Sequence, residues 1–145
     1  VDVILLRRID ANDASPDDKM YTIESKVWTS PIGKDHSSLT DALNGAIKDR
    51  EERAAKTIPY LVLQYERDDD YILANQVKRF GDPVNNPYLK EHFAIAIVES
   101  SQANTHIKNF DKVLQAANTN IPVYLLPIAD LRNIYNTLFL NIPQN

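Results

Sequence analysis

The sequence predicts an α/β protein in which helices flank a mixed central sheet. Short apolar stretches with strand character alternate along the chain with amphipathic stretches of about a dozen residues, the length of an ordinary helix. Such alternation implies crossover connections and a sheet that is covered on both faces. The first two strand-like stretches are joined by a polar turn, which favours an antiparallel pair and makes the sheet mixed. With no internal repeat, we expect a single α/β domain over residues 1–145.

The first part of the chain predicts a hairpin followed by a helix. Apolar residues at the start predict a strand over 1–10, and alternating side chains predict a second strand over 20–28. The polar stretch over 10–18 carries the turn residues that join them. A helix is expected over 38–55, because a capping-box pattern begins at Ser38 and an apolar stripe follows it.

The rest of the chain predicts a further series of strands and helices. In chain order these are a strand over 58–65, a helix over 69–80, a strand over 93–98, a helix over about 107–117, a strand over 121–126 and a helix marked by Leu131, Ile134, Tyr135 and Leu138. The strand over 93–98 has only apolar residues, so we expect it to lie in the core.

Composition excludes several classes of protein. The absence of cysteine rules out disulfides, zinc-thiolate sites and cysteine nucleophiles, and it fits a reducing cytoplasm. No apolar run approaches the roughly 20 residues of a membrane helix, so we expect no contact with a membrane. The formal net charge of −4 argues against tight, non-specific binding to nucleic acid. The chain opens with Val1 rather than Met, which leaves open a trimmed start or a piece of a longer protein.

Several familiar kinds of site are missing. Gly33, Gly45 and Gly81 are scattered and none opens a strand-to-helix turn, so we expect no glycine-rich phosphate loop. No Gly-x-Ser-x-Gly sequence marks a hydrolase nucleophile. Three histidines lie far apart in the sequence, at His36, His92 and His106. They show no metal-ligand spacing, and for each we expect a surface or helix-capping role.

The constellation that carries chemistry is Glu24-Ser25-Lys26 on the second predicted strand. Residues two apart on a strand point to the same face, so the carboxylate of Glu24 and the ammonium of Lys26 project side by side. A carboxylate suits Mg²⁺ or Mn²⁺, and a neighbouring lysine can orient or deprotonate a water or steady a phosphoryl transition state. One acid holds a divalent ion poorly, so a second is needed. If the hairpin pairs Arg8 with Met20, Asp2 lies opposite Lys26 and diagonal to Glu24.

These residues resemble the core of the PD-(D/E)XK nucleases, the restriction-endonuclease-like superfamily. Asp2 matches the first acid of the motif, and Tyr-Thr-Ile-Glu24-Ser-Lys26-Val matches its Glu-x-Lys strand. The resemblance implies that Asp2 and Glu24 bind Mg²⁺ or Mn²⁺ and that Lys26 assists the water that attacks a phosphodiester. Asp17, in the literal Pro-Asp dipeptide, is the second choice for the first acid, since only six residues separate it from Glu24.

The resemblance covers about the first 65 residues of the chain. The helix from Ser38 and the strand over 58–65 take the places of the next two core elements. The family's helix before the first acid has no counterpart here. The β-α-β-α segment from Phe93 onward is an element beyond the minimal family core.

Other residues are candidates for supporting roles around Glu24. Gln64 is a polar residue within the apolar stretch over 58–65, and it is expected to reach the same site. Basic side chains are the natural contacts for substrate phosphates. The candidates are Arg7, Arg8, Lys34 and Lys48.

The leading functional expectation is a metal-dependent nuclease with Asp2, Glu24, Lys26 and Gln64 as its catalytic group, acting on nucleic acid with DNA favoured over RNA. The alternative is that Glu24 and Lys26 form a surface ion pair, and that the chain is a non-catalytic α/β module that binds a protein partner, whether or not it descends from such nucleases. A third hypothesis, a flavodoxin-like small-molecule site, rests on the alternation of strands and helices alone. A homodimer is left open.

Overall fold

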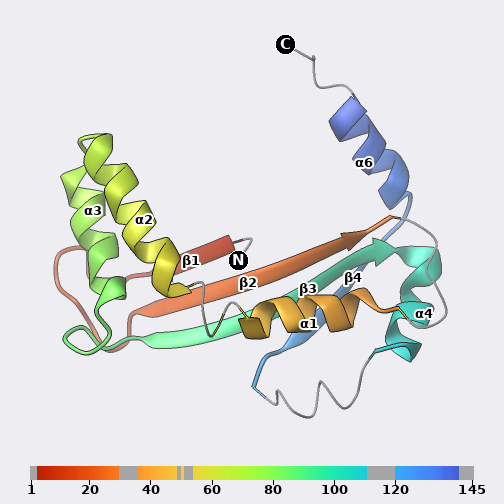
Figure 1. Cartoon of the computed structure of the whole chain (residues 1–145), viewed down its shortest axis with the longest axis horizontal. Coiled ribbons are helices and arrows are strands. Elements are labelled where there is room, and N and C mark those ends of the chain that lie inside the picture. The colour runs from red at the N-terminus through yellow and green to blue at the C-terminus, as the bar shows by residue number, and fades with distance from the viewer. Residues whose placement is uncertain (1–2, 30–35, 49, 51–53, 111–119, 141–145) are drawn as a thin grey trace.

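The computed structural model describes residues 3–29, 36–48, 50, 54–110 and 120–140. It confirms the predicted class: four strands form one mixed sheet in the order β1-β2-β3-β4, and helices pack against it (Figure 1). Within the described residues, no helix is both long enough and apolar enough to cross a membrane.

The chain opens with the predicted hairpin of β1 (Val3–Arg7) and β2 (Lys19–Trp28). The two strands are antiparallel, and Leu6 faces Met20, so the register differs by two residues from the expected pairing of Arg8 with Met20. The loop sets this register, because the buried carboxylate of Asp18 accepts a hydrogen bond of 2.8 Å from the backbone N–H of Ile9. The first strand therefore ends earlier than expected.

A buried ion pair fixes the loop of this hairpin to the helical layer. Arg79 lies 3.1 Å from the Asp18 carboxylate, and both side chains are almost fully buried. The same guanidinium donates hydrogen bonds of 2.8 Å to the backbone carbonyls of Asp13 and Asp10. The ion pair and the two carbonyl bonds thus compensate both buried charges, although Nε of Arg79 has no hydrogen-bond partner.

Two further strands extend the sheet in parallel. β3 (Leu89–Glu99) pairs with β2, and β4 (Val123–Ile128) pairs with β3. The expected core strand is longer than its apolar run, since it begins four residues earlier, at Leu89. Ala94, Ala96 and Val98 alternate on one face of β3 and are fully buried, which confirms its place in the core.

The helices α1 (Ser38–Lys48), α2 (Ala54–Arg67) and α3 (Tyr71–Lys78) cover one face of the sheet. α1 packs its apolar stripe on β2 and β3, with Leu43 fully buried. α2 and α3 pack together over the start of β2, where Ile58 and Phe80 enclose Met20. Figure 1 shows α1 lying along the middle of the strands and α2 and α3 gathered at one end.

Further elements complete the described fold. They are η2 (Arg79–Gly81), η3 (Ser100–Gln102), α4 (Ala103–Lys108) and α6 (Leu131–Leu140). The final helix was predicted from its apolar spacing and is confirmed. Glu99, at the end of β3, accepts a hydrogen bond of 3.1 Å from the backbone N–H of Asp130, which ties the turn before α6 to the sheet.

One predicted element is wrong. The stretch over 58–65 is not a strand but the body of α2, because Ile58, Leu61, Val62 and Tyr65 form one helical stripe that packs in the core. A short apolar run of this kind is compatible with the period of a strand or of a helix, and the burial of that stripe favours the helix. The helix expected over 38–55 is confirmed as α1 over Ser38–Lys48, and α2 starts at Ala54; residues 49 and 51–53 lie outside the described part of the chain.

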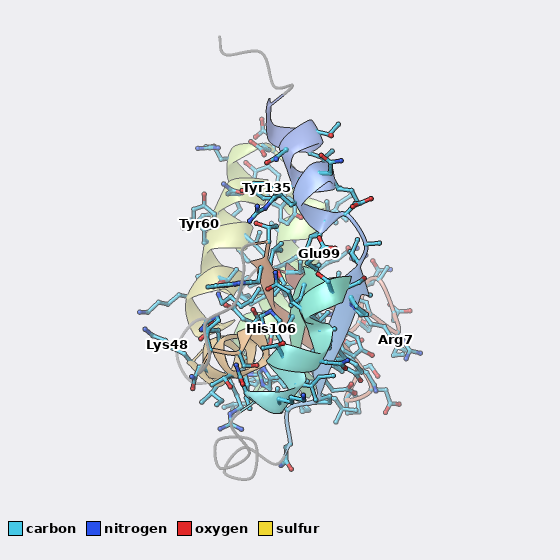
Figure 2. The ribbon with its side chains drawn as sticks, turned by 90° about the vertical axis from the view of Figure 1, so that its right-hand side faces the viewer. Arg7, Lys48, Tyr60, Glu99, His106 and Tyr135 are labelled. Carbon is cyan, nitrogen blue, oxygen red and sulfur yellow. The ribbon has the colours of Figure 1, made fainter. Side chains whose placement is uncertain are left out.

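The expectation that both faces of the sheet are covered is also wrong for the described residues. The second face, here called the open face, carries exposed apolar side chains from three strands, with no described helix lying along it. These side chains are Val3, Leu5, Val27, Tyr124 and Leu126. Figure 2, viewed along the sheet, shows α1 and α2 on one side and Arg7 on the other.

Candidate functional site

Glu24 and Lys26 lie side by side on the helix-covered face of β2, as their spacing predicts. The Nζ of Lys26 donates a hydrogen bond of 2.6 Å to Oε1 of Glu24. The Glu24 side chain is 3% exposed, whereas the Lys26 side chain is 43% exposed. The pair therefore consists of a buried carboxylate and a partly exposed lysine that connects it to solvent.

The backbone of α1 approaches this carboxylate very closely at Gly45. A Cβ atom on Gly45 would lie 2.5 Å from Oε1 and 2.6 Å from Cγ of Glu24, well inside van der Waals contact. Only glycine fits here while Glu24 keeps its position. The space that a side chain would fill on α1 is occupied by the carboxylate, so the helix and the acid are fitted to each other.

This burial separates Glu24 from an ordinary surface ion pair, which was the simplest alternative for a Glu-x-Lys strand. Removing a carboxylate from water is costly even when a lysine compensates its charge, and an apolar residue of similar volume is often more stable at such a position. An ordinary, partly exposed ion pair occurs on the opposite face of the sheet, between β2 and β3. There Lys19 and Glu91 form a partly exposed pair of 2.8 Å.

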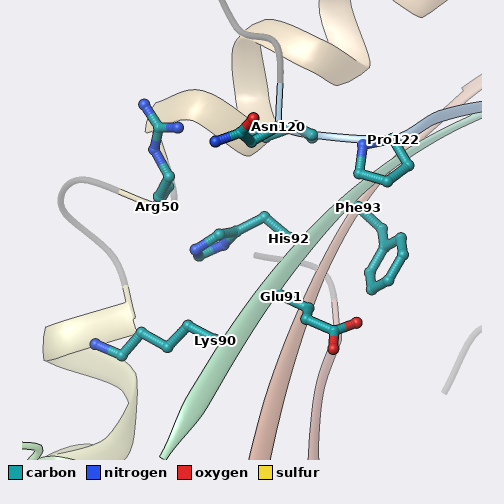
Figure 3. A pocket seen from close by; sticks show the side chains of 8 residues that line it. Arg50, Lys90, Glu91, His92, Phe93, Asn120 and Pro122 are labelled. Carbon is teal, nitrogen blue, oxygen red and sulfur yellow. The ribbon is translucent and has the colours of Figure 1, made fainter.

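The neighbours of Glu24 on the same face are polar as well. Thr22, one step back along β2, shares a hydrogen bond of 2.6 Å between its Oγ1 and Nδ1 of His92 on β3. His92 in turn lines a cavity of about 400 Å³ with Arg50, Lys90 and Asn120. Figure 3 shows Lys90 and His92 projecting to the same side of β3, with Arg50 on a separate segment.

The structure distributes the other predicted site residues as follows. Asp2 and Lys34 lie outside the described residues. Arg7 is exposed on the open face, opposite to Glu24, and Arg8 lies beyond the end of β1, at the far end of the hairpin. Lys48 is exposed in the last turn of α1, on the same side of the molecule as Tyr60 (Figure 2).

Gln64 and Asp17, which were predicted as possible members of the Glu24 site, lie on other elements of the fold. Gln64 was expected on a strand, but it lies on α2, where its Nε2 donates a hydrogen bond of 2.7 Å to the hydroxyl of Tyr60. That expectation is wrong, for the same reason as the strand that contained it. Asp17 is exposed in the hairpin loop, and its neighbour Asp18 is the acid that the fold buries.

The fit of these residues to a divalent ion is partial. The described residues contain no group of three or more histidine, aspartate or glutamate side chains that could hold a metal. Mg²⁺ is usually bound by one or two carboxylates together with waters and substrate phosphate oxygens. Glu24, seated in the space left by Gly45, fits one such carboxylate. The second that the sequence predicts is Asp2.

The histidines are less scattered than their positions in the sequence indicate. The ring of His36 stacks on Trp28 with centroids 4.1 Å apart, and His106 lies 6.4 Å from His36. The fully buried His106 accepts a hydrogen bond of 3.1 Å from the backbone N–H of Ser38, which confirms a capping role at the start of α1. Burial lowers the pKa of His106, and the nearby His36 lowers this pKa further.

Sequence reasoning missed two residues that shape the site. Gly45 was set aside because it opens no phosphate loop, and its role depends on a helix-to-strand approach that the sequence does not show. His92 was assigned a surface or capping role because the three histidines show no metal-ligand spacing in the sequence. Extending the alternation of 94, 96 and 98 backwards to 92 would have placed His92 on the buried face beside Thr22.

Comparison with known proteins shows the family of the chain. No curated protein and no solved structure matched the chain. The sequence model of the family HamA matches residues 1–142, which is nearly the whole chain. The chain therefore belongs to the HamA family.

Proposed function

We propose that this chain is a metal-dependent nuclease of the PD-(D/E)XK type, with Glu24 and Lys26 at its active site. The observation that carries the proposal is the buried carboxylate of Glu24, held 2.6 Å from Lys26 in a space that Gly45 leaves on α1. A buried carboxylate with a solvent-reached lysine beside it is costly for stability and useful for chemistry.

The order of elements supports the same proposal. An antiparallel hairpin leads into the strand of Glu24, a helix crosses over, and a strand returns parallel to it. This is the arrangement that the resemblance to PD-(D/E)XK nucleases implies. The returning strand is β3 rather than the stretch over 58–65, because α2 and α3 stand between the helix and the strand.

Each residue has a defined task in this proposal. Glu24 is a ligand of Mg²⁺ or Mn²⁺, and Asp2 is the second carboxylate. When bound, the ion lowers the pKa of a coordinated water and neutralises charge on the phosphate. Lys26, whose ammonium lies beside Glu24 and reaches solvent, donates a hydrogen bond to the attacking water or to a non-bridging phosphate oxygen.

A second candidate function is a non-catalytic module that binds a protein partner. The apolar open face favours it, because exposed apolar surface that is contiguous over several strands marks interaction sites. It does not require the burial of Glu24, which remains unexplained under this alternative.

A metal titration separates the two candidates. If Glu24 binds Mn²⁺, the wild-type chain gains stability with metal concentration, by about 2.7 kcal/mol at a hundred times the dissociation constant. The Glu24→Gln variant keeps the shape of the side chain and should gain little, whereas the exposed control Glu66→Gln should behave as wild type. Equal stabilisation of wild type and Glu24→Gln would remove Glu24 as a metal ligand.

A further inference from the structure

Neither Glu24 nor Lys26 is suited to take the proton of the attacking water in the proposed reaction. Nζ of Lys26 donates a hydrogen bond of 2.6 Å to Glu24, and an ammonium group has no lone pair that could accept a proton. Glu24 is the proposed metal ligand, and its Oε1 already accepts from Lys26. We therefore expect the general base of the reaction on another element beside these two residues.

An imidazole and a carboxylate meet at the start of α1. Nε2 of His36, just before the helix, lies 3.2 Å from Oδ2 of Asp41, in its first turn, and the two side chains are 31% and 44% exposed. Nε2 is buried beside this carboxylate, which leaves Nδ1 as the nitrogen for a solvent molecule. The two groups are not aligned for a hydrogen bond, as is common for catalytic pairs that have no substrate bound.

The strand β2 places His36 one step beyond Lys26. Trp28 follows Lys26 by two residues, so both side chains project from the same face of β2, about 6.6 Å apart along the strand. The ring of His36 packs on Trp28, with centroids 4.1 Å apart and planes tilted by 36°. Glu24, Lys26 and His36 therefore follow one another along the face of the sheet that α1 covers.

The helix α1 places Asp41 at the same point. α1 runs antiparallel to β2, because its first turn packs at the end of β2 and Gly45 lies against Glu24. Asp41 is one turn before Gly45, on the same side of the helix and about 6 Å along its axis. The acid therefore lies beside the part of β2 that carries Lys26. Strand and helix bring the pair there independently.

Helix electrostatics and packing explain only parts of this arrangement. An acid in the first turn of a helix is favoured by the helix dipole, which accounts for Asp41. The dipole gives no reason for an imidazole beside that acid. Packing on Trp28 requires a flat ring, but it does not require a ring nitrogen 3.2 Å from a carboxylate.

We propose that His36 is the general base of the hydrolysis and that Asp41 positions it. Nδ1 of His36 takes a proton from the attacking water as the water oxygen forms a bond to phosphorus. The bond from phosphorus to the leaving oxygen breaks, and that oxygen takes a proton from solvent. Asp41 stabilises the imidazolium that results, as a carboxylate does beside a catalytic histidine. This inference rests on the proposed nuclease function, and it names the residue that activates the water.

The test separates a base from a ring that only packs on Trp28. His36→Phe keeps a flat ring for that contact and removes both nitrogens, whereas His36→Ala leaves room for added imidazole. In single-turnover cleavage with Mg²⁺, both variants should lose about a hundredfold or more in rate. Imidazole should restore part of the rate to His36→Ala and none to Glu24→Gln. Asp41→Asn should lose less than His36→Phe.

Two controls show whether the fold is kept. Trp28 is the only tryptophan of the chain, so its emission maximum, measured in EDTA, reports the packing beside His36. We expect the same emission maximum and the same free energy of unfolding for wild type and His36→Phe. Asp68→Asn removes a carboxylate from the exposed turn after α2 and should cleave as wild type does.

Cleavage at the wild-type rate by His36→Phe would overturn the inference, and so would a rate of His36→Ala that imidazole does not raise. Either result, together with cleavage that needs Glu24, would retain the nuclease and reject the base. The absence of metal-dependent cleavage by wild type would reject the nuclease and the base together. The two failures are therefore distinguishable.

Discussion

Gly45→Ala tests whether the position of the Glu24 carboxylate matters for function. The added Cβ would lie 2.5 Å from Oε1, about 1 Å inside the optimal contact distance. Glu24 must move by about that amount, which displaces the carboxylate from the position in which it accepts the 2.6 Å hydrogen bond from Lys26. A displacement of about 1 Å at a reacting group costs on the order of a hundredfold in rate.

The same substitution has a small expected effect on stability. Alanine is favoured over glycine within a helix by about 1 kcal/mol. Overpacking of a filled site costs about 1–3 kcal/mol, so the net destabilisation should lie between roughly 0 and 2 kcal/mol. Activity and stability are thus expected to separate, with a large loss of the first and a small loss of the second.

The assay is single-turnover cleavage at fixed Mn²⁺, beside urea unfolding of the same preparations. Asn44→Ala is the matched control, because Asn44 is the exposed neighbour of Gly45 on α1. It should retain wild-type cleavage. A folded Gly45→Ala protein that cleaves at the wild-type rate would refute the reasoning, since the carboxylate would then function away from its observed place.

Two further predictions concern stability. Asp18→Ala leaves the buried guanidinium of Arg79 without its 3.1 Å partner, and it should lower the free energy of unfolding by about 3–5 kcal/mol in urea. The exposed control Asp17→Ala should change this free energy little. Similar values for both variants would show that the ion pair does not fix the hairpin loop. Because burial lowers the pKa of His106 below its ordinary value of 6.5, the unfolded chain binds the proton more readily, so wild-type stability should fall as pH drops below about 6.5. His106→Asn, whose amide oxygen can accept the bond from Ser38, should lose that part of the pH dependence, and an unchanged slope would assign it to other groups.

The class of the fold follows from the sequence because local patterns suffice for it. The alternation along β2 and the apolar run of β3 each define a strand without knowledge of their partners. For the stretch over 58–65, the local pattern does not decide between a strand and a helix, because a run of eight residues with few polar positions fits a strand or one face of a helix. The segment is a helix because Ile58 is buried against Met20 and Phe80. This is a tertiary contact, which the local sequence does not show.

The candidate site also contains residues that the sequence predicts and residues that only the tertiary structure shows. Glu24 and Lys26 are found from their spacing alone, because strand geometry places residues two apart on one face. Gly45 reaches Glu24 through the packing of α1, and His92 reaches Thr22 through the register of β3; neither contact can be read from the local sequence. Phosphate contacts were sought on the hairpin at Arg7, which the alternation of β1 turns to the open face.

Whether Glu24 and Lys26 form a nuclease active site is tested by cleavage of supercoiled plasmid, single-stranded DNA and RNA, each with Mg²⁺, Mn²⁺ or EDTA. Wild type is compared with Glu24→Ala/Lys26→Ala and with the control Glu66→Ala/Lys108→Ala, whose side chains are exposed on α2 and α4. We predict metal-dependent cutting by wild type and control, and none by the first double variant in its folded form. Cutting that survives the loss of Glu24 and Lys26, or no cutting of any substrate by wild type, would contradict it.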